Sequence, residues 1–415
     1  MKQDRTGRRH ILRSAFNWVA LAACLVALYK LAPILVTARV FQNDDFVQYW
    51  AAGRLNLTGG NPYSPGAMES LQAAIGRTRT VMMWNPPMAL AVAMPFGLMP
   101  YPISRLAWLI LEVVVVFLAA TWLWDLYGGS QQRRWLAWAV AFLFSATQGA
   151  LHKGQISPFI LLGIVGFLRY QRSGKPCLAG AFAALVALKP HFLYLFWIAL
   201  LLWSRRQRRW AAFFAAGATV MGATLVAMIA NPAVVGQYIA SVLQDPPIAW
   251  HTPTLGGALR AVLGPVKIWL QFAPLVLGLG WFLARWRGCR GDWRWGEQMS
   301  ILVAVSVISA AYGWTYDQVV MLTMILPATQ LLAPMVKRGP AIALALIGVA
   351  INAVHLGWHG AYTDDWFWWL APLWLAWYLA VRRWGTAPAR PVVAASHFLH
   401  PAHAGGDIGE DHSGA

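Results

Sequence analysis

Long apolar runs separated by short polar segments form the dominant pattern along the chain. Apolar runs of about 17–25 residues are long enough to cross the hydrocarbon core of a bilayer as helices. The pattern therefore predicts an all-α polytopic membrane protein with about twelve transmembrane helices. The approximate spans are 14–37, 103–127, 135–150, 156–169, 176–189, 191–204, 210–230, 265–284, 297–312, 318–335, 340–356 and 366–381.

The basic residues lie in short clusters between these runs, and such clusters favour the cytoplasmic side of a membrane. The chain must leave that side and return to it between successive clusters, which means two spans in each interval. The sequence then predicts a cytoplasmic N-terminus (1–13), an integral-membrane domain (14–384) and a cytoplasmic tail (385–415). The tail is rich in Ala, Gly, Pro and His and is expected to be disordered.

The apolar run 83–100 is an exception, because it contains four prolines. Counting it as a full span would move Arg133 and Arg134 to the outside, and its prolines disfavour a regular helix. We interpret it as a re-entrant or surface-lying element. Residues 38–102 then form one large external loop, in which 44–55 and 65–76 are expected to be short interfacial helices.

Composition agrees with this class, since 59% of the residues are hydrophobic and 12% are charged. The net charge of +18 would suggest a nucleic-acid partner in a soluble protein. Here the Lys and Arg residues instead set the membrane topology, so we expect no nucleic-acid partner. The three cysteines are scattered without CxxC spacing, so neither a disulfide nor a zinc site is expected.

Polar residues other than arginine gather at the external ends of the predicted spans, which indicates that the protein works at that face. Acidic residues are scarce, 15 in 415, so the adjacent Asp44 and Asp45 just after the first span are the most informative pair. The candidate site residues are Asp44, Asp45, Tyr49, Arg54, Tyr63, Lys153, Gln155, Lys189, His191, Tyr316 and Asp317.

Two interpretations of the acidic pair stay open at this point. A carboxylate near the membrane boundary with a like-charged neighbour has a raised proton affinity, as a general base for a hydroxyl group requires. Asp45 also lies four residues before Tyr49, on the same face of a helix. Alternatively, either aspartate caps the helix that follows. Position favours Asp44 as the cap and Asp45 as the base.

Lys153 and Lys189 fall at external helix ends, against the charge rule. A cation placed there can bind a lipid phosphate, whereas the alternative is a long side chain that reaches up to the interface. Tyr316 and Asp317 begin an apolar helix beside further aromatic residues, an arrangement that suits sugar rings but also occurs at ordinary membrane interfaces. Glu112, in the middle of a predicted span, is the best sequence argument for a transporter, and its alternative is a protonated or hydrogen-bonded packing role, which is favoured.

Together these motifs resemble glycosyltransferase family 87, the membrane family that includes polyprenyl-phosphate-mannose-dependent α-mannosyltransferases. The resemblance spans about residues 40–330. It rests on Asp45-Phe46-Val47-Gln48-Tyr49 with Ala51-Ala52, Gly59 or Gly60 to Pro62-Tyr63, Asn85-Pro86-Pro87, Pro95, Gly154-Gln155, Lys189-Pro190, and Tyr316-Asp317 leading to Pro327. Two departures bear on the sugar more than on the fold. Asn85 stands where the family usually has an aromatic residue, and no histidine follows Asp317.

The resemblance implies a C-type membrane glycosyltransferase fold in which an acidic residue of the first external loop deprotonates the acceptor. Asp45 would be that base. Lys153 and Lys189, with Arg54 behind them, would bind the donor phosphate. The implied reaction is inverting transfer of a hexose, with mannose expected, from a polyprenyl-phosphate sugar to a lipid or glycan acceptor at the periplasmic face of a bacterial inner membrane. It needs no metal and no cofactor.

Two alternatives from other functional classes stay open. One is a transporter or flippase of lipid-linked sugars without transferase chemistry, and the other is an envelope assembly factor that binds polyprenyl lipids. A cavity that joins Asp45 to a basic group would favour the enzyme.

Overall fold

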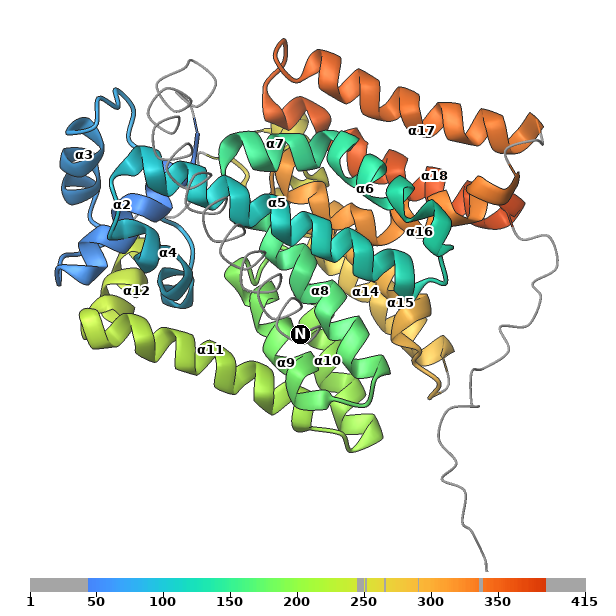
Figure 1. Cartoon of the computed structure of the whole chain (residues 1–415), viewed down its shortest axis with the longest axis horizontal. Helices are drawn as coiled ribbons and strands as arrows, with labels where there is room; N and C mark the ends of the chain where they lie inside the picture. Colours follow the sequence, from blue (N-terminus) through green and yellow to red (C-terminus); the bar gives the residue numbers. More distant parts are fainter. Residues whose placement is uncertain are drawn as a thin grey trace, which may run out of the picture.

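The computed structural model describes residues 44–244, 250, 252–264, 266–289, 291–335 and 339–385. The predicted cytoplasmic N-terminus (1–13), the first predicted span (14–37) and the tail beyond residue 385 lie outside the described residues. Within the described ranges every regular element is helical, as the apolar pattern predicts. Figure 1 shows that α5, α11 and α17 run in the same general direction across the molecule, as the helices of a membrane bundle do.

The helices have the following bounds: α2 Phe46–Leu57, α3 Pro65–Ala73, η2 Pro87–Ala89, α4 Leu90–Gly97, α5 Tyr101–Leu126, η3 Gln131–Arg133, α6 Arg134–Leu143, α7 Ser145–Lys153, α8 Ser157–Arg172, α9 Pro176–Ala183, η4 Ala184–Leu188, α10 Tyr194–Gln207, α11 Ala211–Ala230, α12 Val234–Gln244, α13 Leu255–Leu263, η5 Ile268–Gln271, α14 Ala273–Gly288, α15 Trp295–Ser309, η6 Thr315–Met321, α16 Leu322–Leu332, η7 Ala333–Met335, α17 Gly339–Trp358, η8 Asp364–Trp369 and α18 Leu370–Gly385. The η elements are short 3₁₀ helices.

Five helices in the described part of the chain are long and apolar enough to cross a membrane. They are Tyr101–Leu126, Ala211–Ala230, Ile268–Gly288, Thr315–Met335 and Gly339–Trp358. Of the other predicted spans, those within the described residues correspond to shorter helices, such as α8 with 16 residues and α15 with 15. A straight crossing needs about 20 residues, so the count of twelve spans stays a prediction.

Two predicted boundaries are corrected by the structure. The span expected at 135–150 is broken, because Phe144 has an extended backbone between the end of α6 and the start of α7. The stretch 231–264, for which no helix was expected, contains α12 and α13. The sequence window there is interrupted by prolines and threonines, and this hides two helices of 11 and 9 residues.

The region before α5 contains the short helices expected there, and two of them cross closely. The apolar run 83–100 forms only η2 and the eight-residue α4, which is too short to span a membrane. α4 packs on α2 through glycines: a Cβ atom at Gly53 would lie 2.6 Å from the carbonyl oxygen of Ala93. The small residues therefore allow α4 to hold α2, and with it Asp45, in place.

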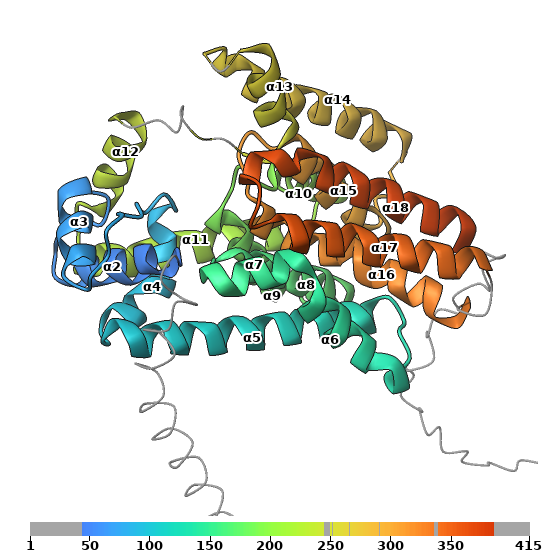
Figure 2. The same cartoon turned by 90° about the horizontal axis from the view of Figure 1, so that it is seen from above.

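The outer helices expose apolar side chains, as helices that face lipid do. Ile229 on α11 is 84% exposed, and Leu277 on α14 and Leu346 on α17 are also exposed. Figures 1 and 2 both show α17 beside α18 at one side of the molecule. Inside, α5 buries Trp108, Val116 and Leu123 completely. These features are those of a polytopic membrane protein.

α5 extends from one end of the helix bundle to the other. Its 26 residues make it about 39 Å long, which matches the thickness of a bilayer. Tyr101, at its start, lines a large cavity. Trp124, near its other end, lines a smaller cavity together with Arg133 and Arg382, two residues of the clusters predicted to be cytoplasmic. The large cavity therefore lies at the end of α5 away from these basic clusters.

Candidate active site

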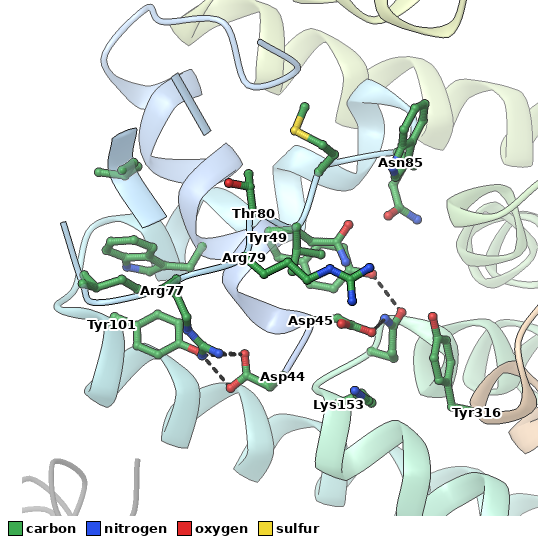
Figure 3. A pocket seen from close by; sticks show the side chains of 18 of the residues that line it. Asp44, Asp45, Tyr49, Arg77, Arg79, Thr80, Asn85, Tyr101, Lys153 and Tyr316 are labelled. Atoms are coloured by element: carbon green, nitrogen blue, oxygen red, sulfur yellow. Dashed lines mark hydrogen bonds and ion pairs between the residues drawn. The ribbon is translucent and has the colours of Figure 1, made fainter. Parts of the chain in front are cut away.

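The large cavity has a volume of about 1570 Å³ and is enclosed by segments that are far apart in the sequence. α2, the segment 74–85 and the start of α5 contribute most of its lining. The end of α7, residues around η6 and η8, Lys189 and Trp250 also line it. Figure 3 shows Asp45, Lys153 and Tyr316 facing this space from three different elements. The cavity contains both aspartates of the acidic pair together with basic and aromatic side chains.

Asp44 is held in a buried ion-pair cluster. Its carboxylate lies 3.2 Å from Nη2 of Arg77 and 3.1 Å from Nε of Arg105, and it accepts a hydrogen bond of 2.7 Å from the Tyr101 hydroxyl. The Asp44 and Arg105 side chains are both fully buried. Two arginines and a hydroxyl thus occupy the carboxylate, which leaves Asp44 a structural role.

Asp45 has different surroundings, although it is the next residue. It occupies the N-cap position of α2, but its side chain makes no capping hydrogen bond. Its backbone N–H donates to the carbonyl oxygen of Lys153 at 2.7 Å, and its carboxylate accepts a hydrogen bond of 2.7 Å from Nε2 of Gln155. The carboxylate faces the cavity and is partly exposed. The expectation that one of the aspartates caps α2 is not met, because neither side chain makes a capping hydrogen bond in the described residues.

Burial raises the pKa of Asp45 above the ordinary value of an aspartate, and the charge of Asp44 acts in the same direction. The nearby cations Lys153 and Lys189 and the hydrogen bond from Gln155 lower the pKa and offset part of this effect. A carboxylate with a raised pKa that stays accessible accepts a proton more readily than an ordinary aspartate. This is the property that a general base for a hydroxyl group requires.

Gln155 is oriented by three contacts. Its Oε1 atom accepts hydrogen bonds from the Tyr49 hydroxyl at 3.2 Å and from Nζ of Lys189 at 3.4 Å. Both donors require an acceptor, so the amide must present its Nε2 atom to Asp45. Tyr49 is itself held by a stacked contact with Trp108 at a ring distance of 5.5 Å. The Asp45 carboxylate is therefore positioned by a rigid polar network.

Lys189 forms an ion pair with Asp317. The two atoms Nζ and Oδ1 are 2.5 Å apart, and both side chains are largely buried. Asp317 also accepts hydrogen bonds from the Ser157 hydroxyl and from the backbone N–H of Trp314. The charge of Lys189 is thus balanced inside the protein, which makes it a weaker candidate for phosphate binding than a cation without such a partner.

The remaining predicted residues divide into two groups. Arg54 and Tyr316 line the cavity, with Arg54 exposed at the end of α2. Tyr63 and His191, which were expected to line the site, do not line this cavity. Tyr63 is buried, where its hydroxyl donates to the carbonyl oxygen of Asn85 at 3.0 Å, and His191 lies against Tyr312. Tyr63 is corrected to a packing residue, because its polar atom is used within the fold.

Sequence reasoning missed several polar residues of the cavity, and three of them bear on the site. Arg79 is exposed and extends into the cavity near Asp45 (Figure 3), and no ion pair or hydrogen bond of its side chain is described. Arg77 pins Asp44. Gln48 is only 7% exposed, lines the cavity and makes no described side-chain hydrogen bond. The two arginines in Gly76-Arg77-Thr78-Arg79-Thr80 break the charge rule just as Lys153 does, and this signal could have identified them.

Glu112 does not belong to the cavity. It is fully buried, 3.9 Å from Nη1 of Arg105, and thus stands behind the Asp44 cluster. Among the described residues, no group of three or more His, Cys, Asp or Glu side chains is placed to hold a metal ion. The cavity offers the carboxylates of Asp45 and Asp364 beside cationic side chains.

A comparison with known protein families gives one match. The model of glycosyltransferase family 87 matches residues 84–311, which is more than half of the chain. The matched segment begins after α2 and ends before η6, so it includes Lys153, Gln155 and Lys189 but neither Asp45 nor Asp317. No curated protein and no solved structure matches the chain significantly.

Proposed function

Since the chain belongs to glycosyltransferase family 87, we propose that it transfers a hexose, mannose in the simplest case, from a polyprenyl-phosphate sugar to a lipid or glycan acceptor, with Asp45 as the general base. The family and the apolar helices together make the protein a membrane glycosyltransferase. Donor, sugar and catalytic residue are the proposed part. The whole segment 14–384 would form the catalytic domain, with both termini in the cytoplasm.

The observation that carries the proposal is the contrast between two adjacent carboxylates. The Asp44 carboxylate forms ion pairs with Arg77 and Arg105. The Asp45 carboxylate instead accepts a hydrogen bond from a neutral amide and faces a cavity large enough for a lipid-linked sugar. Asp45 combines access to substrate with a raised pKa. Asp364 also lines the cavity and has a raised pKa, but its carboxylate is held by hydrogen bonds from the backbone N–H and the hydroxyl of Thr315. This combination supports Asp45 as the base.

Cationic groups beside Asp45 support a phosphate leaving group. Arg79 and Lys153 line the same part of the cavity as Asp45 (Figure 3). A guanidinium group can donate two parallel hydrogen bonds to a phosphate, and an ammonium adds a compact charge. We assign the donor phosphate to Arg79 and Lys153, with Arg54 at the rim. Lys189 then acts through Gln155 and Asp317.

The proposed reaction is a single displacement. The acceptor hydroxyl transfers its proton to Asp45 while its oxygen attacks the anomeric carbon of the donor sugar. The bond from that carbon to the phosphate oxygen breaks, and polyprenyl phosphate leaves with the electron pair. Arg79 and Lys153 stabilise the charge that develops on the leaving phosphate. Attack opposite to the leaving group inverts the configuration of the anomeric carbon.

The position of the cavity supports a periplasmic site. It lies at one end of α5, and Arg133 and Arg382 lie at the other. Basic clusters favour the cytoplasm, so the cavity is assigned to the opposite face of a bacterial inner membrane.

The substitution Asp45→Asn tests the base. In a membrane assay with radiolabelled polyprenyl-phosphate mannose, we expect transfer to fall by about 10²–10⁴-fold, the usual contribution of a general base. Donor binding and membrane insertion should be retained. Asp365→Asn is the matched control, because Asp365 is a nearby carboxylate that does not line the cavity. Full transfer by Asp45→Asn would refute the base, and movement of the lipid-linked sugar across vesicles without transfer would favour a transporter.

A further inference from the structure

Three tryptophans from separate segments form one wall of the large cavity. Trp84 precedes η2, Trp314 precedes η6, and Trp250 stands between α12 and α13. Trp250 is the central ring: its centroid lies 5.0 Å from that of Trp84, edge to face, and 6.0 Å from that of Trp314. All three side chains are partly exposed, and all three line the same cavity as Asp45. We call this group the tryptophan wall.

The tryptophan wall is held in place by hydrogen bonds of neighbouring residues. Next to Trp84, the Asn85 amide donates to the carbonyl oxygen of Leu188 at 2.8 Å. The backbone N–H of Trp314 donates to Asp317 at 3.1 Å. Behind Trp250, the ring of Tyr312 packs edge to face at 5.7 Å. These contacts order the segments that carry Trp84 and Trp314 and pack the Trp250 ring against Tyr312, which reduces the entropy lost on binding.

Partly exposed tryptophans are common at membrane interfaces, but these rings face a cavity that also carries polar groups. Gln48 is largely buried, lines the cavity and has no described hydrogen-bond partner for its amide. Thr80 lines it too. Flat aromatic faces beside hydrogen-bonding side chains match a sugar ring, whose C–H groups are apolar and whose hydroxyls form hydrogen bonds. A lipid acyl chain would leave the Gln48 amide unsatisfied.

The size of the cavity leaves room for a second ligand besides the donor sugar. Small-molecule sites usually measure about 300–1,000 Å³, and this cavity measures about 1570 Å³. The donor phosphate is assigned to the side of Arg79 and Lys153. The tryptophan wall is left for the molecule that presents its hydroxyl to Asp45.

We propose that the tryptophan wall is an acceptor subsite for a saccharide of two or more rings, so that the acceptor is a glycan chain and not a simple hydroxylated lipid. This proposal deepens the proposed function and rests on it, because only a glycosyltransferase would use the bound saccharide as an acceptor. The wall would stack one sugar ring while the next ring presents its hydroxyl to Asp45. Stacking reads the apolar face of a ring and tolerates different hexoses.

The test measures saccharide binding without catalysis. Saturation-transfer NMR on the full-length protein in nanodiscs would use manno-, gluco- and galacto-oligosaccharides of two to six rings, with the monosaccharides for comparison. We expect binding of at least one oligosaccharide series, about tenfold weaker binding by Trp250→Ala and Trp314→Ala, and partial retention by Trp250→Phe. Trp366→Ala is the control, because Trp366 is 49% exposed and does not line the cavity.

The outcomes separate the subsite from the catalytic proposal. Asp45→Asn should bind oligosaccharides as the natural protein does, so inactivity of that variant leaves the subsite intact, and an active Asp45→Asn refutes the base alone. No oligosaccharide binding by the natural protein, or unchanged binding by the Trp250→Ala and Trp314→Ala variants, would overturn the subsite. Loss of membrane insertion in these variants, measured by flotation with vesicles, would instead show that the wall anchors the protein in lipid.

Discussion

Gln155 and Asp45, which lie 110 positions apart in the chain, are joined by a hydrogen bond of 2.7 Å from Nε2 of the amide to the carboxylate. The same amide accepts hydrogen bonds from Tyr49 and Lys189 through its oxygen. This arrangement decides which of its two ends meets Asp45. Gln155 is thus a positioning residue for the proposed base, and Lys189 acts on Asp45 through it.

Gln155→Leu should therefore lower kcat while the protein stays folded. A hydrogen bond to a charged group contributes about 1.5–3 kcal/mol, which corresponds to about a 10–100-fold loss of transfer. Gln155→Glu should lose more, because it places a second carboxylate against Asp45 and moves the acid limb of the pH profile upward. Gln148→Leu, on the exposed side of α7, is the control. If Gln155→Leu left both kcat and the pH profile unchanged, the positioning role would be wrong.

The pH profile of transfer should show the raised pKa of Asp45. The base must be ionised, so activity is complete above this pKa and falls as the pH drops through it. The acid limb should therefore lie above about pH 4, the value of an ordinary aspartate. Burial is the main cause of the shift, and Lys153 opposes it. The measurement is kcat at saturating donor between pH 4 and 9.

Removing the opposing cation sharpens this pH test. Lys153→Met takes away a charge that favours the ionised carboxylate, so the acid limb should move to higher pH. Lys175→Met, an exposed lysine just before α9, should leave the limb in place. An acid limb that is the same in all three proteins would show that Asp45 does not control the profile.

Asp44→Asn should damage stability more than chemistry. The substitution leaves the buried Arg105 with Glu112 at 3.9 Å as its nearest described acidic partner, and breaking such a buried pair costs about 3–5 kcal/mol. Asp125→Asn is the matched control, because its pair with Arg134 is 29% exposed and worth at most about 1 kcal/mol. Thermal unfolding in detergent, followed by size-exclusion chromatography, distinguishes them. Equal melting temperatures would contradict the structural role of Asp44.

Arg79→Gln should raise the KM for the donor lipid. A charged contact to the phosphate is worth about 1.5–3 kcal/mol, so the increase should be about 10–100-fold. Arg79→Lys should recover part of the affinity, because it keeps the charge but loses the planar fork. Arg209→Gln, in an exposed cluster predicted to be cytoplasmic, serves as the control. A donor KM that responds to Lys189→Met but not to Arg79→Gln would reverse the assignment.

Some residues of the site could be identified from the sequence and others could not. Asp45 and Lys153 stood out because each breaks a local pattern, an acid in an acid-poor chain and a cation on the predicted external side. Gln155 stood out through the Gly154-Gln155 motif of the family resemblance, and the structure places all three residues around one cavity. Arg79 broke the same pattern but had no motif around it. Trp250 had no signal at all, because tryptophan is common in this chain and 25 are present.

The sequence by itself determined the class of the protein. A bilayer leaves unpaired backbone groups unsatisfied, so long apolar runs must become helices, and the pattern alone therefore predicted an all-α membrane protein. The scarcity of acids pointed to Asp44 and Asp45. Only the tertiary structure decided between them, because the partners that neutralise a charge come from distant positions. Arg105 pairs with Asp44, which lies 61 positions away in the chain, and Asp317 pairs with Lys189, which lies 128 positions away. The electrostatic energy of a charged pair depends on the distance between the two groups and on their burial, and the local sequence does not determine either.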